Sequence, residues 1–516
     1  MIFRFPPAPV IGSMLVVAGL CACSVRPEPL AAPQGVQFAA EIKSALASDT
    51  EALVRPLDLY EAIARALVYN QELKAEQMAR ALGEAELRLQ SAEMLPQFVA
   101  GAQIYSRDKQ AASYSRSAAS GAAGGYSTSS ERTARSGELS FSWNILDLGV
   151  SYFRARQAAD RSLIAAEQYR RIANRIVEET RIAYWRAVAL QRLDEGLARV
   201  EADMAGALNN AARLGAAGLT EPGEALGAQR DLLSIRRDLD IQRRSLVGAD
   251  DNLRALINHP ANQPLRLAAG PRPNLPAINR MSFEDLADQV LTHRPEVRQS
   301  AYEMRITAEE ARIAFIELFP SINLALGATL DQNPFLLHQG WTSAASRASW
   351  QVMKILQYPM RSATIDTKSE LDRLRARSVA VAVILQGQLS LSRFAQIRQE
   401  YATLQQLADV QRRLALHAEN QRAVGRAGST LVTRERMNAL LSDARREAAY
   451  GELQAAYGNV LTSLGHDSAD PAMTPGLSAA EIASRLRTIE TAAFDRAQGA
   501  APRHASARVV RQGPAQ

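Results

Sequence analysis

Cysteine is almost absent from this chain of 516 residues, which has only Cys21 and Cys23. Past residue 23 the absence excludes intrachain disulfides, zinc sites built from thiolates and cysteine nucleophiles. Aromatic residues make up only 6% of the chain, and the net charge of +6 is spread at helical spacing without a basic block. We therefore expect no binding to nucleic acid.

Enzyme signatures are also missing. The sequence has no HExxH, no phosphate loop, no Gly-x-Ser-x-Gly and no dinucleotide fingerprint. Its six histidines are scattered and none is paired at a metal-ligand spacing. The sequence predicts no enzyme, no cofactor and no metal site.

Long apolar runs are lacking as well. Beyond the N-terminal region we find no apolar stretch of about 18 residues, so the sequence predicts no membrane-spanning helix. Arg4 precedes a shorter apolar run, Val10 to Ala18, which is typical of a secretory signal peptide. The run leads to Leu20-Cys21-Ala22-Cys23, which resembles a bacterial lipobox.

The lipobox resemblance implies that residues 1–22 are a signal peptide and that Cys23 carries the lipid, with palmitate among its acyl chains. Cys21 is the poorer acceptor because bulky Leu20 precedes it. Ser24, rather than Asp, follows Cys23, and by resemblance to sorted lipoproteins this favours the outer membrane. A plain signal peptide cut nearby is the alternative.

An internal repeat organises the rest of the chain. Residues 57–96 align without a gap on residues 281–320, at a constant shift of 224. Identical pairs include Glu72/Glu296, Arg88/Arg312 and Pro96/Pro320. In both copies an amphipathic helix stops at a proline and alternating residues follow, so each half is expected to be one structural unit.

The alternation predicts two strands in each half, each with one apolar and one polar face. The strands are expected near 97–105, 138–145, 321–330 and 347–355. The apolar face would carry Phe141 and Trp143 in the second strand, Leu324 in the third and Trp350 in the fourth. Between the strands we expect loops at Ser106 to Ser136, which is rich in Ser, Ala and Gly, and at Asp331 to Ser346.

Two very long helical hairpins are expected after the strands, at 149–257 and 361–464. No proline interrupts Gly149 to Leu214 or Arg361 to Val424, and each stretch could reach nearly 100 Å as a helix. The resulting organisation is a linker at 23–56, a first repeat at 57–270, a second repeat at 271–465, and a largely disordered tail at 466–516.

This order of elements behind a lipobox resembles the TolC family of outer-membrane efflux and secretion channels. The resemblance covers Leu57 to about Leu464. It includes the stretch Trp143 to Gly149, which is similar to the family's strand exit. In the second half the corresponding stretch, Trp350 to Pro359, lacks the glycine. It implies a mainly α fold with a membrane β-barrel: a homotrimer with a twelve-stranded barrel and an α-helical periplasmic tunnel. Four strands in one chain cannot close a barrel, whereas three chains supply twelve.

The resemblance also implies a function. The trimer would be lipid-anchored in the outer membrane and would act as a passive exit duct. Its partners would be outer-membrane lipid, a periplasmic adaptor and an inner-membrane pump, either proton-driven or of ABC type. Cargo class is left open among drug, metal, protein and polysaccharide.

The family's periplasmic tip can be carried over by position. Its turns fall on Gly218 and Leu219 in the first half and on Gly425 in the second. Glu224 keeps an acidic residue that the family usually has, whereas Leu431 and Arg434 stand where acids are common. These three are the aperture candidates, and Arg434 could form a positive ring or pair with Glu224 of a neighbouring hairpin. Alternatively, the arginines cap helix ends or face solvent.

Two other functions remain open from the sequence. An adaptor-type lipoprotein would also have a helical hairpin, but it should show a β-rich lipoyl-like segment and one hairpin only. A structural coiled-coil lipoprotein would explain the long helices but not the alternation around Trp143 and Trp350.

Overall fold

The computed structural model describes residues 29–48, 51, 53, 55–218, 221–268, 275, 282–466 and 477–488. The chain divides into two compact units, Met1–Ala52 and Leu53–Gln516. The described part of the first unit contains one helix, α2 (Ala32–Ser48). The segment predicted to be a linker thus contains a helix, because the Ala, Gln, Glu and Lys residues that follow Pro33 are good helix formers.

The internal repeat is confirmed by the element boundaries of the second unit. The first copy consists of α3 (Leu59–Tyr69), α4 (Gln71–Ala92) and β1 (Gln97–Ser106). The second consists of α8 (Phe283–His293), α9 (Pro295–Ile316) and β5 (Ser321–Asp331). Each element begins 224 residues after its counterpart. The N-caps also correspond, since the side chains of Asp58 and Ser282 each accept a hydrogen bond from the backbone N–H of the residue three positions later.

One antiparallel sheet joins the two copies. It also contains β4 (Thr133–Asn144) and β6 (Gly340–Ser349), and the strand order is β1-β4-β5-β6. The predicted loop after β1 instead holds a second antiparallel pair, β2 (Ser113–Arg116) and β3 (Ala123–Ser127), and β4 begins earlier than expected.

The fourth strand was predicted too late in the sequence. It ends at Ser349, so Trp350 and Val352 follow the strand and are not part of it. Alternation in the true strand is weak because its apolar positions hold small residues such as Ala344 and Ala348. The helix then starts at Met353 and includes Pro359 in its second turn.

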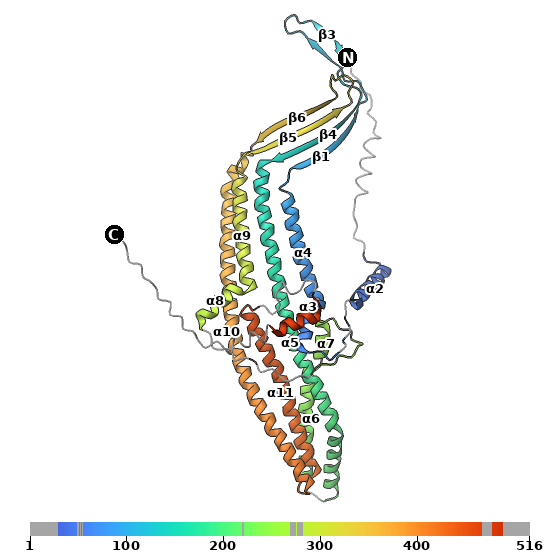
Figure 1. Cartoon of the computed structure of the whole chain (residues 1–516), viewed down its shortest axis with the longest axis vertical. Coiled ribbons are helices and arrows are strands. Elements are labelled where there is room, and N and C mark those ends of the chain that lie inside the picture. The colour runs from blue at the N-terminus through green and yellow to red at the C-terminus, as the bar shows by residue number, and fades with distance from the viewer. Residues whose placement is uncertain are drawn as a thin grey trace, which may run out of the picture. The chain divides into compact units, whose positions relative to one another are not determined.

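Two helices of unusual length leave the sheet (Figure 1). These are α5 (Ile145–Ala216), with 72 residues, and α10 (Met353–Ala423), with 71. At 1.5 Å per residue each extends roughly 105 Å. The chain returns through α6 (Pro222–Leu246) and α7 (Ala249–Leu256) in the first half and α11 (Ser429–Ser463) in the second.

One finding differs from the expected lack of apolar helical segments. By length and composition, α10 holds one 18-residue window that is apolar enough to cross a membrane, and 22% of that window is buried. Length and composition alone are weak evidence for a span, and a single helix of this kind is also found in soluble assemblies.

The main hydrophobic core lies midway along the long helices, where α3, α5, α7, α8, α10 and α11 meet. Tyr184 and Trp185 of α5 pack edge to face, and Trp185 packs in the same way on Tyr450 of α11. The Tyr184 hydroxyl donates to the Ala268 carbonyl at 2.8 Å, next to the bridge between Leu57 and Leu267. Burial raises the pKa of this hydroxyl well above its usual range.

Part of the C-terminal tail joins this core. Residues 479–488 are helical, and Ser478 and Glu481 cap them reciprocally. Ile482 and Leu486 are buried against the core. This differs from the predicted disorder, because apolar residues recur here at helical spacing within an otherwise polar tail.

Candidate functional site

The four-stranded sheet has one mainly apolar and one mainly polar face. Phe98 of β1, Phe141 of β4 and Leu326 of β5 occupy one row. Successive side chains along a strand point to opposite faces, so the adjacent row places Gln97, Ser142 and Ala325 on the other face. The strands contain 10, 12, 11 and 10 residues, close to the 9–11 that a tilted strand needs to cross a bilayer.

The apolar face carries Phe98, Ala100, Ala102, Ile104, Leu139, Phe141, Trp143, Ile322, Leu324, Leu326, Ala328, Leu330, Ala344 and Ala348, together with the polar residues Arg135, Thr342 and Ser346. The polar face carries Gln97, Gln103, Glu138, Ser140, Ser142, Asn323, Thr329, Ser343, Arg347 and Ser349, together with Val99, Tyr105, Ala325 and Trp341.

Three of the four residues that the sequence assigned to the apolar face lie there. Phe141 and Trp143 belong to β4, and Trp143 is the direct partner of Leu324 on β5. Trp350 does not belong to the sheet, which corrects the prediction. Its indole N–H donates to the Leu318 carbonyl at 2.9 Å, so the ring fastens the start of α10 to the end of α9.

Clefts of opposite character lie where the sheet meets the helices. The first, of about 360 Å³, is lined by the apolar residues Ile145, Leu146, Gly149, Ile316, Phe319, Pro320 and Ile322. The second, of about 130 Å³, is lined mainly by polar residues: Glu93, Gln97, Ser142, Asn144, Asp147 and Asn323, with Met94, Leu95, Trp143 and Leu148. Ile322 belongs to the apolar face of the sheet, and Gln97, Ser142 and Asn323 belong to its polar face. The difference between the faces therefore continues below the strands.

The far ends of the helical hairpins hold the predicted tip residues. Gly218 and Gly425 have φ of +62° and +74°, a left-handed conformation that favours glycine, and each ends its long helix. Glu224 is exposed in the first turn of α6, and Leu431 is 39% exposed in the first turn of α11. Leu219 lies outside the described residues.

Arg434 lies three residues after Leu431 on α11 and contacts its neighbour Glu435, with Nε and Oε1 3.2 Å apart. Two residues further along α11, Arg436 bridges three helices. Its guanidinium binds Glu419 of α10 at 2.6 Å and Asp203 of α5 at 2.8 Å. These hydrogen bonds, the one to Glu419 most strongly, raise the pKa of Arg436.

The sequence around Arg436 does not indicate these contacts. Its two acidic partners lie 17 and 233 residues away, and only the packing of α5, α10 and α11 brings them together. Other ion pairs join α11 to neighbouring helices: Arg192 of α5 contacts Glu447 of α11 at 2.7 Å, and Arg445 of α11 contacts Asp238 of α6 at 3.2 Å.

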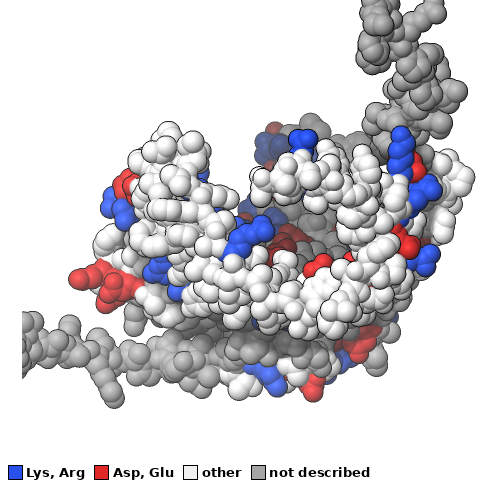
Figure 2. All heavy atoms as spheres, turned by 90° about the horizontal axis from the view of Figure 1, so that it is seen from above, with Lys and Arg blue, Asp and Glu red and all other residues white. Residues whose placement is uncertain are grey.

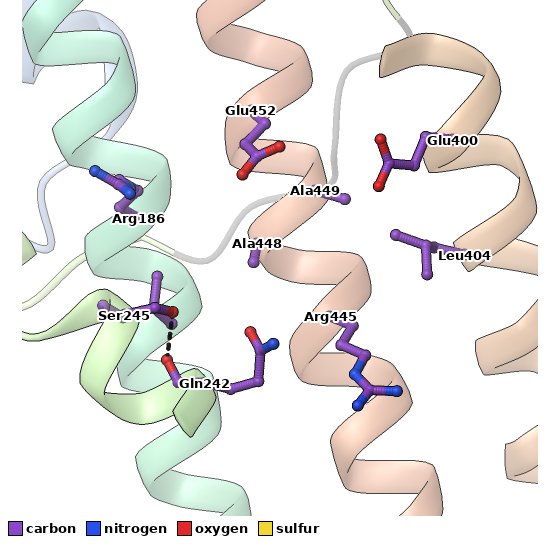
Figure 3. A pocket seen from close by; sticks show the side chains of 10 residues that line it. Arg186, Gln242, Ser245, Glu400, Leu404, Arg445, Ala448, Ala449 and Glu452 are labelled. Carbon is purple, nitrogen blue, oxygen red and sulfur yellow. Dashed lines mark hydrogen bonds between the residues drawn. The ribbon is translucent and has the colours of Figure 1, made fainter. Parts of the chain in front are cut away.

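A further cleft, of about 340 Å³, opens between these helices (Figure 3). Arg186 comes from α5, Glu400 from α10, and Arg445 and Glu452 from α11, so both charge signs face the opening. Its remaining lining residues are Gln242, Ser245, Leu246, Leu404, Ala448 and Ala449. The Ser245 hydroxyl donates to the Gln242 carbonyl at 2.7 Å. The arrangement is a polar groove between hairpins.

Charge on the surface is mixed as well. Seen from above, most described side chains are uncharged, and the charged ones of both signs form small separate groups (Figure 2). Among the described residues, no group of three or more His, Cys, Asp or Glu side chains could hold a metal ion.

No protein-family model matches the sequence, and no curated protein matches it. Solved structures do match the fold. The outer-membrane channel CmeC of Campylobacter jejuni superposes with a TM-score of 0.62 at 13% identity, over 83% of this chain and 89% of that one. The outer-membrane channel OprN gives 0.59 at 15% identity, over 79% and 90%. MtrE, the Neisseria gonorrhoeae outer-membrane channel, gives 0.57 at 13% identity, over 80% and 91%. The resemblance seen in the sequence is thus confirmed at the level of the fold.

Proposed function

We propose that the chain is one protomer of a homotrimeric outer-membrane channel. The trimer is the passive exit duct of a tripartite efflux or type I secretion system, and it receives cargo from an inner-membrane pump through a periplasmic adaptor. The observation that carries this proposal is the two-faced sheet, whose strands lead directly into α5 and α10. Such a sheet has no use in a purely structural coiled coil.

Barrel closure is the first step of the argument. β1 and β6 are the edges of the sheet order, and open edges are not tolerated in lipid. If β1 of each chain pairs with β6 of the next, three four-stranded sheets form one closed barrel of twelve strands. The apolar face then meets lipid and the polar face lines a wet lumen.

The apolar window of α10 fits the same assembly. Val381, Leu385 and Leu389 recur at helical spacing and are 58%, 61% and 68% exposed in the single chain. A second copy packed along α10 would cover this stripe. We therefore assign the window to subunit contact and not to a membrane span.

Two finer assignments belong to the proposal. Cys23 lies outside the described residues, and we propose that its lipid anchors the chain in the outer membrane. At the opposite end, three copies of the tip turns form the periplasmic aperture, with Glu224, Leu431 and Arg434 as candidate lining residues and Arg436 as the bond that joins the hairpins behind them.

A cysteine scan tests the closure step. Ala100 of β1 is changed to cysteine together with one residue of β6 at a time, from Trp341 to Arg347, in the otherwise thiol-free body of the chain. Oxidation should give crosslinked trimers on denaturing gels at one or two β6 positions only, because disulfides need Cβ atoms about 4 Å apart. Ser140 of the inner strand β4, combined with the same β6 scan, is the matched control and should give none between chains. Absence of crosslinks at every β6 position would contradict the proposal.

A further inference from the structure

We infer that the apolar cleft between α5 and α9 binds one acyl chain of a membrane phospholipid and that the arginine pair below it binds the phosphate of the same lipid. This inference rests on the proposed channel function, since it requires the apolar face of the sheet to meet lipid. The proposed occupant is a phospholipid of the surrounding bilayer.

Cleft shape gives the first support. The cleft is about 360 Å³, and Ile322 makes it continuous with the apolar face of the sheet. Gly149 forms part of its wall, and a Cβ built there would lie 3.7 Å from Ile316, so any larger side chain would enter the cleft. Phe319 is 53% exposed at its mouth and stacks edge to face on Phe315. An open apolar pocket at this level suits a hydrocarbon chain.

The charge below the cleft gives the second support. On α5 the stripe Ile145, Gly149, Phe153 and Arg156 follows helical spacing, as do Arg312 and Ile316 on α9, and Phe319 follows that helix. The stripes end at a buried carboxylate, Glu309, which Arg156 contacts at 3.1 Å and Arg312 at 2.8 Å. These two guanidiniums and one carboxylate leave one net positive charge.

Each guanidinium also keeps donors for a ligand. Both arginines contact Glu309 through one terminal nitrogen, Nη2 of Arg156 and Nη1 of Arg312, and an arginine carries five N–H groups in total. Their side chains are 49% and 52% exposed, whereas that of Glu309 is 5% exposed. Arginine is well suited to bind phosphate oxygens.

The distances along the helix match an amphipathic lipid. Arg156 lies seven residues beyond Gly149, about 10 Å along α5 and away from the sheet. Between them, Phe153 packs against Arg312, whose guanidinium carbon is 5.8 Å from the ring centroid. An apolar chain on the sheet side and a phosphate on the helix side therefore fit the order of these residues.

The apolar cleft beside Gly149 and the arginine pair on Glu309 have no counterpart in the other repeat. In the first repeat, Arg88 corresponds to Arg312, but Ala85 replaces Glu309. The first eight residues of α10 include no glycine, so the counterpart of the Gly149 wall is filled by larger side chains. We therefore expect one bound phospholipid per chain.

Native mass spectrometry of the full-length trimer tests the inference. Trimer in detergent is titrated with dioleoylphosphatidylglycerol, and bound lipid is counted. Wild type should saturate at one tight lipid per chain. Gly149→Phe, which fills the cleft, and Arg312→Gln, which removes a phosphate donor, should each weaken binding about tenfold. Arg312→Gln is a surface change, so it keeps the test decisive if Gly149→Phe does not assemble.

Arg373→Gln is the matched control. Arg373 is as exposed as Arg312 and also pairs with a glutamate three residues before it, Glu370, but that glutamate is half-exposed and does not line the cleft. It should bind lipid as wild type does, and so should Cys23→Ala, because the occupant is not the protein's own anchor. Equal loss in Arg373→Gln, loss in Cys23→Ala, or unchanged binding in Gly149→Phe and Arg312→Gln would each overturn the inference. Trimer mass and channel conductance are recorded on the same preparation. A conducting trimer that retains no lipid refutes the lipid-binding inference alone. A chain that forms no trimer refutes both the proposed function and this inference.

Discussion

The indole N–H of Trp350 donates a hydrogen bond to the backbone carbonyl of Leu318 at 2.9 Å. Leu318 lies in the turn between α9 and β5, and Trp350 lies between β6 and α10. The contact therefore joins two chain segments at the level where the sheet gives way to helices.

Trp350→Phe should lower the stability of the protein by about 0.5–1.5 kcal/mol, because one hydrogen bond is lost while most of the ring remains. Trp143→Phe is the control. The Trp143 indole nitrogen is buried without a hydrogen-bond partner, so its removal should be neutral or stabilising. Thermal unfolding of the purified variants in detergent measures both. A larger loss in Trp143→Phe than in Trp350→Phe would contradict the assignment.

The facing of the sheet predicts an asymmetric response to charge. Phe141→Arg and Leu324→Arg place a guanidinium on the apolar face and should cost about 2–4 kcal/mol each near the bilayer midplane. Ser140→Arg lies one residue away on the polar face and should assemble nearly normally. Yield of trimer in outer-membrane fractions is the measurement. Equal loss in all three variants would show that the facing is wrong.

Arg436 should control the aperture more strongly than Arg434. Arg436→Ala frees α11 from both Glu419 and Asp203, and loosened hairpins should raise single-channel conductance in planar bilayers. Arg434→Ala removes only a contact with the adjacent Glu435. If Arg434 lines the opening as a positive ring, Arg434→Asp should shift ion selectivity toward cations. Unchanged conductance in Arg436→Ala would remove the proposed bond between hairpins.

Glu178 predicts a pH dependence with a defined sign. Burial raises the pKa of this carboxyl, although Asn459 donates a hydrogen bond to it at 3.1 Å. A raised folded pKa means that the folded state holds the proton more tightly, so stability falls as pH rises from the unfolded pKa through the folded one. Glu178→Gln keeps the acceptor for Asn459 and removes the charge. Its melting temperature relative to wild type should therefore be higher at pH 7 than at pH 4.

The neighbouring Glu179→Gln is the control for that measurement. Glu179 forms a half-exposed ion pair with Arg175 at 3.0 Å, so its loss should cost little at neutral pH. A Glu178→Gln protein with the same melting difference at pH 4 and pH 7 would refute the linkage.

Lipidation of Cys23 predicts a chemical label. Wild-type protein grown with a clickable palmitate analogue should carry the label in outer-membrane fractions, and Cys23→Ala should not. Cys21→Ala separates the two cysteines and should keep the label. Label that persists in Cys23→Ala would mean that the lipobox was misread.

Periodic and duplicated features were predictable from the sequence, whereas long-range pairings were not. The shift of 224 gave the correspondence between the two copies, because both repeat the same apolar spacing up to Pro96 and Pro320. The single helix expected in each copy is instead two helices, α3 and α4 in the first and α8 and α9 in the second, because the chain is extended at Asn70 and Arg294. β6 was misplaced because Ala344 and Ala348 are too small to mark an apolar face. The partners of Arg436 depend on how three helices align over their whole lengths, and local sequence holds no signal for that alignment.

The edge strands β1 and β6 also constrain how the protein is made. Before assembly, each newly synthesised chain has two rows of open backbone hydrogen-bonding groups beside an apolar surface, which is the combination most prone to aggregation. Assembly of the trimer must therefore be faster than aggregation, and the fraction of chains that assemble depends on the protomer concentration. If the proposed trimer forms in the outer membrane, cells that produce this chain at high levels should need more of the periplasmic chaperones that shield such surfaces, and slow expression should increase the yield of trimer.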